Sequence, residues 1–443
     1  MKIEIRHLSR IEGHAHLIVD LAQGELRACR LEIAETPRFF ESILKGRHFS
    51  DVAPIMARIC GVCSNAHTLV SLAATEQAFG IAISAQTLQL RRLLACGEIL
   101  QSHILHLYFL AIPDYLGVPS ILPLAKTHRE LVARALRLKQ LANSLCQAVG
   151  GRSVHPVTPC VGGFFVLPQA STLQALRRQL VVALPDLEET VDLFGGLEIP
   201  AFDRETEYLC LRPEGSYPLL GDTLVTSDGI TTAVADHATI IEQYQVPHST
   251  AKFARLSRNS YMVGPLARVK NSFASLSPMA RKVASAIQLE PSTVNPYRNL
   301  GARLVEVIHC VEQAIHLIDA VLLPGLRSEP LAVAPRAGTG VAAIEAPRGT
   351  LFHSYRYDGA GCIESADCLI PTAQNLGNLE ADLQALVPTL LHLPQDQLTL
   401  CLEKLVRAYD PCLSCATHLL TVQFVGHQSA GRPLLRTPAL ESF

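Results

Sequence analysis

The sequence predicts a mainly helical α+β fold in which small β-sheets accompany a central bundle of long helices. Three observations predict it. Long stretches repeat apolar residues at helical spacing, two regions alternate apolar and polar residues with period two, and the stretch 300–322 is apolar on most of its circumference. A helix of this last kind needs protein on every side, so 300–322 is expected to lie at the centre.

The elements follow in order along the chain. Residues 2–34 alternate in the segments IEIR, HAHLIVD and ELRACRLEIA, which predicts a small antiparallel sheet. From Arg38 onward the apolar spacing becomes helical, and Pro113 is expected to end the first long helix. Long helices are predicted at 85–111, 128–149, 171–193, 278–291, 300–322 and 376–407.

Loops rich in proline and glycine are expected at 151–168, 212–222 and 323–340, and a second β-rich region at 340–371. The chain shows no internal repeat and no low-complexity segment. These features predict one large domain, 1–418, whose chemical motifs meet only in three dimensions.

Composition narrows the function. The net charge of −2 and the absence of Lys/Arg blocks argue against nucleic-acid binding. The longest charge-free apolar stretch, between Glu98 and Asp114, is shorter than the roughly 20 residues that a membrane span needs. The start, MKIEIRHLSRIEGH, lacks the apolar region of a signal peptide, so a direct membrane span is not expected.

The apolar and cysteine contents carry further information. Apolar residues make up 49% of the chain and charged residues 18%, which predicts a large core or a surface covered by a partner. Thirteen cysteines, an odd number that includes two CxxC pairs, favour a reducing compartment and metal ligation over a disulfide framework.

The two CxxC pairs are RICGVCSNAH at 58–67 and DPCLSCATH at 410–418. If they converge, four thiolates can hold zinc, an iron–sulfur cluster or another soft transition metal. On spacing alone, a zinc site that pins the two ends of the chain together is an even alternative. The adjoining long apolar helices, and a histidine and a charged residue in each motif, favour a reaction site instead.

The patterns RxCGxCxxxH and DPCxxCxxH resemble the paired signatures of the large subunit of [NiFe]-hydrogenases. The resemblance covers essentially the whole chain. It includes RIEGH at 10–14, FFESILKGR at 39–47, HLYFLAIPDY at 106–115, HP at 155–156 and EAPRG at 345–349. It implies the catalytic subunit of an enzyme that splits H2 reversibly and heterolytically into protons and electrons.

The resemblance implies that nickel is bound by all four cysteines, with Cys60 and Cys412 as terminal ligands. It also implies that Cys63 and Cys415 bridge to an iron that carries CO and cyanide. Soft thiolates suit such a redox-active metal. The metal would act as a Lewis acid beside a thiolate base when H2 is split.

Further roles are implied residue by residue. Glu12 matches the proton-relay glutamate that accepts from the Cys412 sulfur, although from its surroundings alone it would be a solvated turn residue. Arg348 matches the arginine suspended over the open metal position, and its guanidinium is always charged. Asp114 and Asp410 match the acidic residues that orient this arginine.

Three more positions surround this set. Pro347 would shape the pocket wall beside the iron ligands, and His67 would donate a hydrogen bond to a bridging cysteine sulfur. Glu41 and His418 match a magnesium-type site, which a backbone carbonyl near 368–370 would complete.

The other nine cysteines are scattered in apolar surroundings and are expected to be buried and unreactive. They form no cluster-binding run, so an iron–sulfur small subunit, with further electron-transfer subunits, is expected as a partner. The spelling LSC at 413–415, with the segments 246–253 and 261–268, resembles the cytoplasmic, cofactor-coupled hydrogenases.

Several alternatives stay open. The extension 419–443 is either removed by a maturation protease or retained. The quinone-reductase subunit of respiratory complex I shares the expected fold but typically lacks the four cysteines. A zinc-bound scaffold of the same architecture and an H2-sensing regulatory subunit remain as non-metabolic alternatives.

Overall fold

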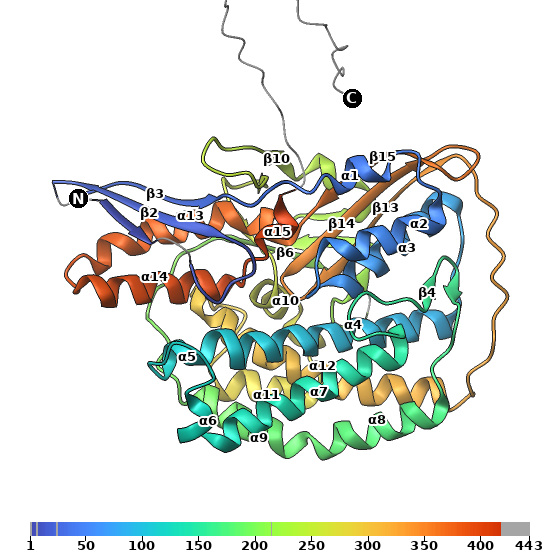
Figure 1. The fold of residues 1–443 in the computed structure, drawn as a ribbon, viewed down its shortest axis with the longest axis horizontal. Coiled ribbons are helices and arrows are strands. Elements are labelled where there is room, and N and C mark those ends of the chain that lie inside the picture. The colour runs from blue at the N-terminus through green and yellow to red at the C-terminus, as the bar shows by residue number, and fades with distance from the viewer. Residues whose placement is uncertain (1, 6–7, 24, 214, 418–443) are drawn as a thin grey trace, which may run out of the picture.

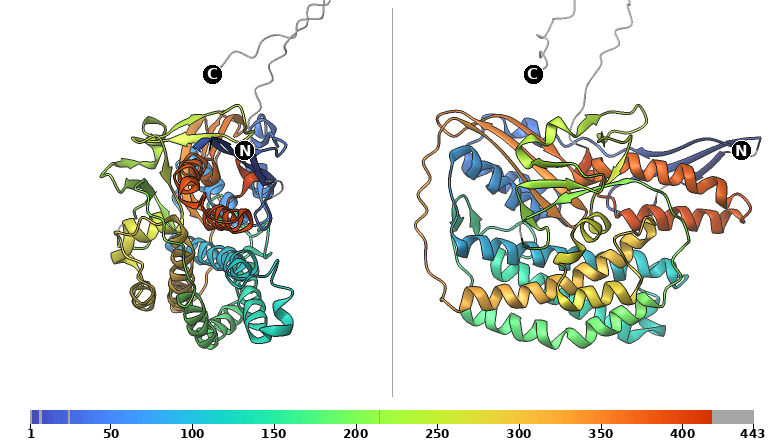
Figure 2. Two further views of the ribbon diagram at one scale, coloured as in Figure 1. Left: turned by 90° about the vertical axis from the view of Figure 1, so that its left-hand side faces the viewer. Right: turned by 180° about the vertical axis from the view of Figure 1, so that it is seen from behind.

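The computed structural model describes residues 2–5, 8–23, 25–213 and 215–417. Long helices run side by side along the lower half of the molecule in Figure 1, and the sheets lie above them with the remaining helices. The same two layers are seen from the side and from behind in Figure 2. The predicted α+β class, with a bundle of long helices, is confirmed.

The bundle is built around α4 (Ala85–Leu105) and α12 (Asn299–Leu322), which pack against each other. Helix α12 also contacts α8, α10 and α11, and most of its residues are buried, so its predicted central position is confirmed. The other bundle helices are α7 (Arg129–Gly150), α8 (Ala170–Val182), α9 (Leu184–Gly195) and α11 (Pro278–Ala286).

One predicted helix continues past its expected end, and two others are each divided into two helices. The first continues past Leu105 as η2 (His106–Ala111), a π-helical turn, and then as α5 (Ile112–Tyr115), so Pro113 does not end it. The stretch 171–193 is divided into α8 and α9 before Pro185, because a proline cannot continue the hydrogen-bond ladder of the preceding turns.

The stretch 376–407 is likewise two helices, α13 (Pro371–Leu390) and α14 (Gln395–Tyr409), with Pro394 at the start of the second. The N-terminal sheet is antiparallel, as predicted, in the order β1-β2-β3. Its strands are β1 (Lys2–Ile5), β2 (Ala15–Ala22) and β3 (Glu25–Ile33), and α13 packs against β3.

The predicted β-rich region forms a sheet in the order β15-β14-β13-β7. Its strands are β7 (Leu220–Gly221), β13 (Gly338–Ala346), β14 (Gly349–Tyr357) and β15 (Ile363–Leu369). Helix α3 (Ser64–Phe79) lies directly on β13. A Cβ at Gly340 would be 1.9 Å from the carbonyl oxygen of Ala74, so only glycine permits this approach.

A third sheet, in the order β12-β6-β8-β9, was missed by the sequence analysis. Strand β6 (Glu207–Leu211) is buried at every position and its neighbours are two to four residues long, so no period-two pattern marks them. Its other strands are β8 (Thr223–Thr226), β9 (Thr231–Ala233) and β12 (Tyr261–Met262).

The shorter elements connect these layers. They are α1 (Phe40–Leu44), α2 (Phe49–Met56), η1 (Ala57–Ile59), α6 (Leu124–Thr127), β4 (Pro159–Cys160), β5 (Gly163–Phe164), η3 (Val234–Thr239), β10 (Glu242–Tyr244), β11 (Phe253–Arg255), α10 (Pro265–Ser272), η4 (Phe273–Ser275), η5 (Pro296–Arg298) and α15 (Leu413–Ala416). Residues 323–337 rise along one edge from the bundle to β13 (Figure 1).

One helical stretch, Ala85–Tyr115, is long and apolar enough to cross a membrane by composition. Within the protein, 83% of its most apolar window is buried, which identifies it as a core helix. His418 and the extension 419–443 lie outside the described residues.

Candidate metal centre

The four cysteines of the CxxC motifs lie together. Cys60 follows η1 in extended conformation, and Cys63 directly precedes α3. Cys412 directly precedes the short helix α15, and Cys415 lies within it. All four are buried, and their sulfur atoms lie within 4.8 Å of one another. The sulfur–sulfur distance is 3.5 Å between Cys60 and Cys412 and 3.9 Å between Cys63 and Cys415.

The electrostatics of the cluster call for a cation. Hydrogen bonds from the other thiols, that of Cys412 first, hold the pKa of Cys60 well below its ordinary value. Burial, followed by the neighbouring sulfurs, raises the pKa of Cys415 well above its ordinary value. Four thiolates at such separations therefore ionise together only around a multivalent cation, so the donor set fits a soft transition metal.

Glu12 reaches this cluster from the turn before β2. Its Oε2 lies 3.2 Å from the sulfur of Cys412 and accepts a hydrogen bond from the backbone N–H of Ser414 at 3.1 Å. The Ser414 hydroxyl donates to its other oxygen. Glu12 is half-buried, so its carboxylate connects the buried thiols with the exterior.

The neighbouring glycine permits this contact. Gly13 has a φ of +89°, and a Cβ there would be 2.8 Å from the Cβ of Leu413. The turn of Glu12 therefore packs on the backbone of α15 only because residue 13 lacks a side chain.

Arg348 lies in the two-residue turn between β13 and β14, where Ala346 pairs with Gly349. Its Nε donates to the carbonyl oxygen of Asp410 at 2.6 Å and its Nη2 to Oδ1 of the same residue at 3.1 Å. Burial alone would raise the pKa of Asp410, but the charge of Arg348 outweighs it and holds the pKa below its ordinary value. The third guanidinium nitrogen, Nη1, is buried and has no partner among the described residues.

A family model for nickel-dependent hydrogenases matches residues 38–134 and 233–418 of the chain. The chain belongs to the nickel-dependent hydrogenase family. It is an enzyme, the catalytic subunit of a [NiFe]-hydrogenase, and neither the quinone-reductase subunit nor a zinc-bound scaffold.

The relatives and the solved structure to which this chain is similar are also hydrogenases. The alpha chain of sulfhydrogenase 1 from Pyrococcus furiosus is 33% identical over 95% of this chain and 98% of its own length. An F420-non-reducing hydrogenase chain of Methanothermobacter thermautotrophicus is 29% identical over 96% of each chain. The crystal structure of an NAD+-reducing [NiFe]-hydrogenase in the H2-reduced state superimposes with a TM-score of 0.83 at 28% identity, and the match covers 94% of this chain and 99% of that one.

The role expected for Asp114 in this hydrogenase is wrong. Asp114 does not contact Arg348: its carboxylate accepts from Nη2 of Arg407 at 2.9 Å, and also binds Nε of Arg407 and Nη2 of Arg10. It therefore fixes α14 to the segment before Glu12, and Asp410 alone of the two orients Arg348.

His67 and Pro347 each have a polar partner within the protein. Nδ1 of His67 lies 3.1 Å from Nε2 of His353, so a hydrogen bond to a cysteine sulfur would have to use the other ring nitrogen. Burial lowers the pKa of His67 to about 4. The carbonyl oxygen of Pro347 accepts from Nη2 of Arg268 at 3.2 Å.

Glu41, on α1, is buried beside β15. It accepts from the backbone N–H of Cys368 at 3.0 Å and lies 3.5 Å from the ammonium of Lys252. Burial is the first cause that raises its pKa, and the charge of Lys252 opposes it. The predicted partner His418 lies outside the described residues.

Two buried ionisable side chains that bind the backbone around the site were not predicted from the sequence. Glu98, on α4, accepts from the backbone N–H groups of Asn65 and Ala66 at 2.7 and 2.9 Å, directly after Cys63. Arg268, on α10, donates to the carbonyl before Pro347 at 3.0 Å as well as to that of Pro347 itself. Charged residues inside otherwise apolar helices were the signal that could have found such side chains.

The nine other cysteines fit the expectation of buried thiols. Seven of them are buried, and Cys362 and Cys401 are half-buried. Burial first, then the charge of a neighbouring glutamate, raises the pKa of Cys29 to about 12. Burial also raises the pKa of Cys160 to about 11.

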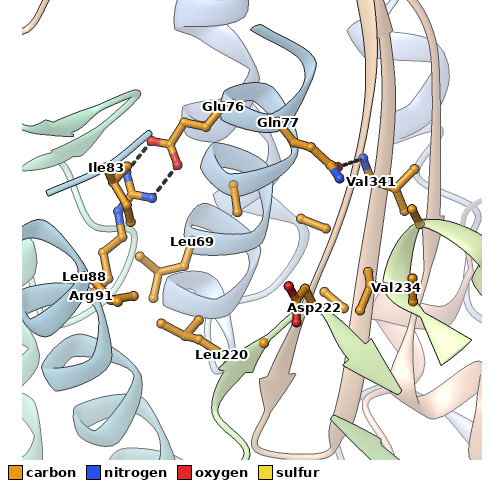
Figure 3. A pocket seen from close by; sticks show the side chains of 16 residues that line it. Leu69, Glu76, Gln77, Ile83, Leu88, Arg91, Leu220, Asp222, Val234 and Val341 are labelled. Atoms are coloured by element: carbon orange, nitrogen blue, oxygen red, sulfur yellow. Dashed lines mark hydrogen bonds and ion pairs between the residues drawn. The ribbon is translucent and has the colours of Figure 1, made fainter. Parts of the chain in front are cut away.

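Two of the cavities outside the thiol cluster are lined by residues of α3. The first, of about 420 Å³, is enclosed by α3, β7 and β13, and one wall carries the buried ion pair of Arg91 and Glu76 (Figure 3). The second, of about 380 Å³, is an apolar cleft beside the Cys60 turn, and its walls include Arg58, His155 and Phe165. No cysteine of the metal centre lines either cavity.

Proposed function

We propose that this protein cleaves H2 with nickel on all four cysteines and an iron, carrying CO and cyanide, on Cys63 and Cys415. The observation that carries the proposal is the 3.2 Å contact between Cys412 and Glu12 at the edge of a buried four-sulfur cluster. The metals, when bound, supply a Lewis acid and accept the electron pair of H2.

The chain itself handles the protons. The Cys412 thiolate is the base that takes up the two protons of H2, one after the other, and its sulfur is hydrogen-bonded to Oε2 of Glu12. Each proton passes to this carboxylate, which is half-buried and delivers it toward water. The Ser414 N–H and hydroxyl hold Glu12 in place for the transfer.

Arg348 supplies a fixed positive charge beside the sulfurs. Asp410 holds its Nε and Nη2, which leaves the buried Nη1 to meet H2 or a cyanide on the iron. Pro347 and the buried surroundings exclude water from this side. A donor that is already oriented needs no reorganisation during the reaction.

We infer that an iron–sulfur small subunit covers the apolar cleft beside Cys60. Four apolar side chains are exposed around it, with Phe165 69% and Val166 63% exposed, together with Val157 and Leu331. Nδ1 of His155 lies 2.8 Å from the carbonyl oxygen of Ala57, so this face is directly connected to the Cys60 turn. Electrons leave here, toward any further electron-transfer subunits.

The magnesium-type site is also a proposal. Glu41 and His418 would bind a divalent cation, and the backbone beside Cys368 is already at the carboxylate. The cation would tie the end of the described chain to α1. The extension 419–443 is proposed to be removed by a maturation protease, which mass spectrometry of the purified complex tests directly.

A cytoplasmic, cofactor-coupled enzyme is the subtype that we propose. The solved NAD+-reducing hydrogenase and the Methanothermobacter relative support it by similarity. A steady turnover with H2 in the purified complex would support the enzyme, whereas turnover slower by orders of magnitude would favour the H2-sensing alternative.

Glu12→Gln tests the central step. The variant complex should keep its nickel and its infrared bands from CO and cyanide, and should lose H2 oxidation by about 10²–10⁴-fold, the range of general acid–base catalysis. Glu25→Gln, an exposed glutamate at the start of β3, is the matched control and should be unchanged. A Glu12→Gln complex with a normal rate would rule out the proposed proton route.

A further inference from the structure

The last turn of α14 leads directly into the metal centre. After Tyr409 the chain turns at Asp410, which has a φ of +55°, and reaches Cys412 two residues later. A helix end leaves its last carbonyl groups without partners in the helix. Whatever binds these carbonyls therefore sets the position of Asp410 and of the cysteine beyond it.

Two side chains from the bundle bind them. Nε2 of His106, in η2, lies 2.7 Å from the carbonyl oxygen of Arg407. Arg303, on α12, donates through Nη1 to the carbonyl oxygen of Ala408 at 2.7 Å and through Nη2 to that of Tyr409 at 3.2 Å. The fork of one guanidinium thus spans the two residues before Asp410.

Arg303 differs in its charge partners from Arg268 and Arg407, two other buried arginines. Arg268 forms ion pairs with Glu306 and Glu345, and Arg407 pairs with Asp114. Arg303 is 0% exposed, and no carboxylate lies within ion-pair distance of it in the parts of the chain that the structure describes. A buried charge without a partner is destabilising, so a purely structural clamp would be better served by a neutral donor.

The positive charge of Arg303 instead acts on Asp410, the residue that holds Arg348. Burial lowers the pKa of Arg303 to about 10, with the charge of Asp410 opposing this, so the guanidinium stays charged at neutral pH. The other charged groups that act on it are Arg348, Glu306 and Arg268. Asp410 is in turn bound to Arg348, whose free nitrogen lies at the metal centre.

We propose that Arg303 is a positioning residue for the metal centre, one that fixes the turn of Asp410 and Cys412 and raises the reduction potential of the metals held by the thiolates. The proposal rests on the proposed function. A positive charge in a poorly polarisable interior favours the state that carries more electrons. Lysine could supply the charge, but only arginine spans two carbonyls with one rigid fork.

The test compares three variants of the complete complex: Arg303→Met, Arg303→Lys and the control Arg298→Met. Arg298 precedes α12 and also binds a carbonyl at 3.0 Å, but this carbonyl belongs to Ile287, directly after α11, and not to the turn before Cys412. For each variant, the nickel content, the infrared bands, the midpoint potential of the metal centre and the H2 oxidation rate per nickel are measured.

In Arg303→Met the midpoint potential should become more negative, and the rate per nickel should fall at least about tenfold, as expected when a reacting group is misplaced. Arg303→Lys should keep a potential close to that of the unmodified complex while its rate falls, because the charge remains and the fork is lost. Arg298→Met should match the unmodified complex in both quantities.

An unchanged potential and rate per nickel in Arg303→Met would overturn the proposal. If that variant takes up no nickel, Arg303→Lys decides, since a lower rate at unchanged potential supports the clamp and a normal rate with normal bands overturns it. Failure of the proposed function would look different, because the unmodified complex and Arg298→Met would then lack nickel and hydrogenase activity.

Discussion

The backbone N–H of Ser414 donates to Oε2 of Glu12 at 3.1 Å, and the hydroxyl of the same serine binds the other carboxylate oxygen. Ser414 lies between Cys412 and Cys415, so a residue placed between two proposed metal ligands also holds the proposed proton acceptor. The two proposed metal ligands and the proposed proton acceptor are therefore all positioned by one short helix, α15.

Ser414→Ala tests this arrangement. The variant keeps the N–H contact to Glu12 but loses the hydroxyl, so we expect a rate of H2 oxidation lower by about tenfold to a hundredfold, the worth of one hydrogen bond to a charged group. Nickel content should be unchanged. Ser414→Thr, which restores a hydroxyl, should recover most of the rate, and a Ser414→Ala enzyme with full activity would show that the hydroxyl contributes nothing.

Gly13→Ala should impair both stability and activity. The φ of +89° and the close approach to Leu413 predict a loss of about 1–3 kcal/mol of unfolding free energy, together with displacement of Glu12. Gly46→Ala is the control, since its φ is +74° with open space around a Cβ. It should lose stability from the backbone alone and keep its hydrogenase rate, as measured by chemical denaturation and H2 uptake.

Cys63→Ser should lose nickel, whereas Cys362→Ser should keep it. Serine oxygen is a harder ligand than a thiolate, so metal affinity should fall by more than about tenfold, the loss that even an outer-shell substitution causes. Cys362 is half-buried and remote in sequence from both motifs. Metal analysis of the two purified complexes gives the answer, and equal nickel contents would contradict the ligand assignment.

Acid should destabilise the bundle through His309. Its Nδ1 accepts from the backbone N–H of Ser277 at 3.0 Å, and burial lowers its pKa from 6.5 to about 4. Below pH 6.5 the unfolded chain binds a proton at His309 that the folded chain does not bind. The contribution of neutral His309 to stability is therefore full above this pH and is lost as the pH falls toward 4.

The variant His309→Asn keeps an acceptor but does not titrate. Between pH 7.5 and pH 5 the unmodified protein should lose about 2 kcal/mol more unfolding free energy than this variant. His316→Asn, at an exposed position on the same helix, should behave like the unmodified protein. Equal pH dependence in all three proteins would mean that the pKa of His309 is not lowered in the folded protein.

The cysteine motifs and the long helices could be predicted from the sequence because spacing and periodicity are local properties. The partner of Asp114 could not, because nothing in its neighbourhood shows that Arg407, on a distant helix, lies closer to it than Arg348 does. The third sheet was missed for a related reason. Its strands are short, and β6 is buried at every position, so β6 shows no alternation that would distinguish it from a helix.

Arg303 illustrates a second reason why part of the site could not be predicted from the sequence. Its presence in the apolar stretch 300–322 signals a buried charge, but the two carbonyls that it binds belong to residues more than 100 positions away. Only the folded chain shows that it clamps the turn before Cys412.

The two halves of the thiol cluster are 352 positions apart in the chain. During synthesis, the ribosome releases Cys60 and Cys63 long before Cys412 and Cys415 emerge, so the nascent chain presents an open pair of thiols beside α3. The sulfur cluster and its contact with Glu12 are complete only when α15 packs against Glu12, so neither can form before Cys412 and Cys415 have been synthesised. Assembly of the thiol cluster is thereby tied to synthesis of the last segment that the structure describes.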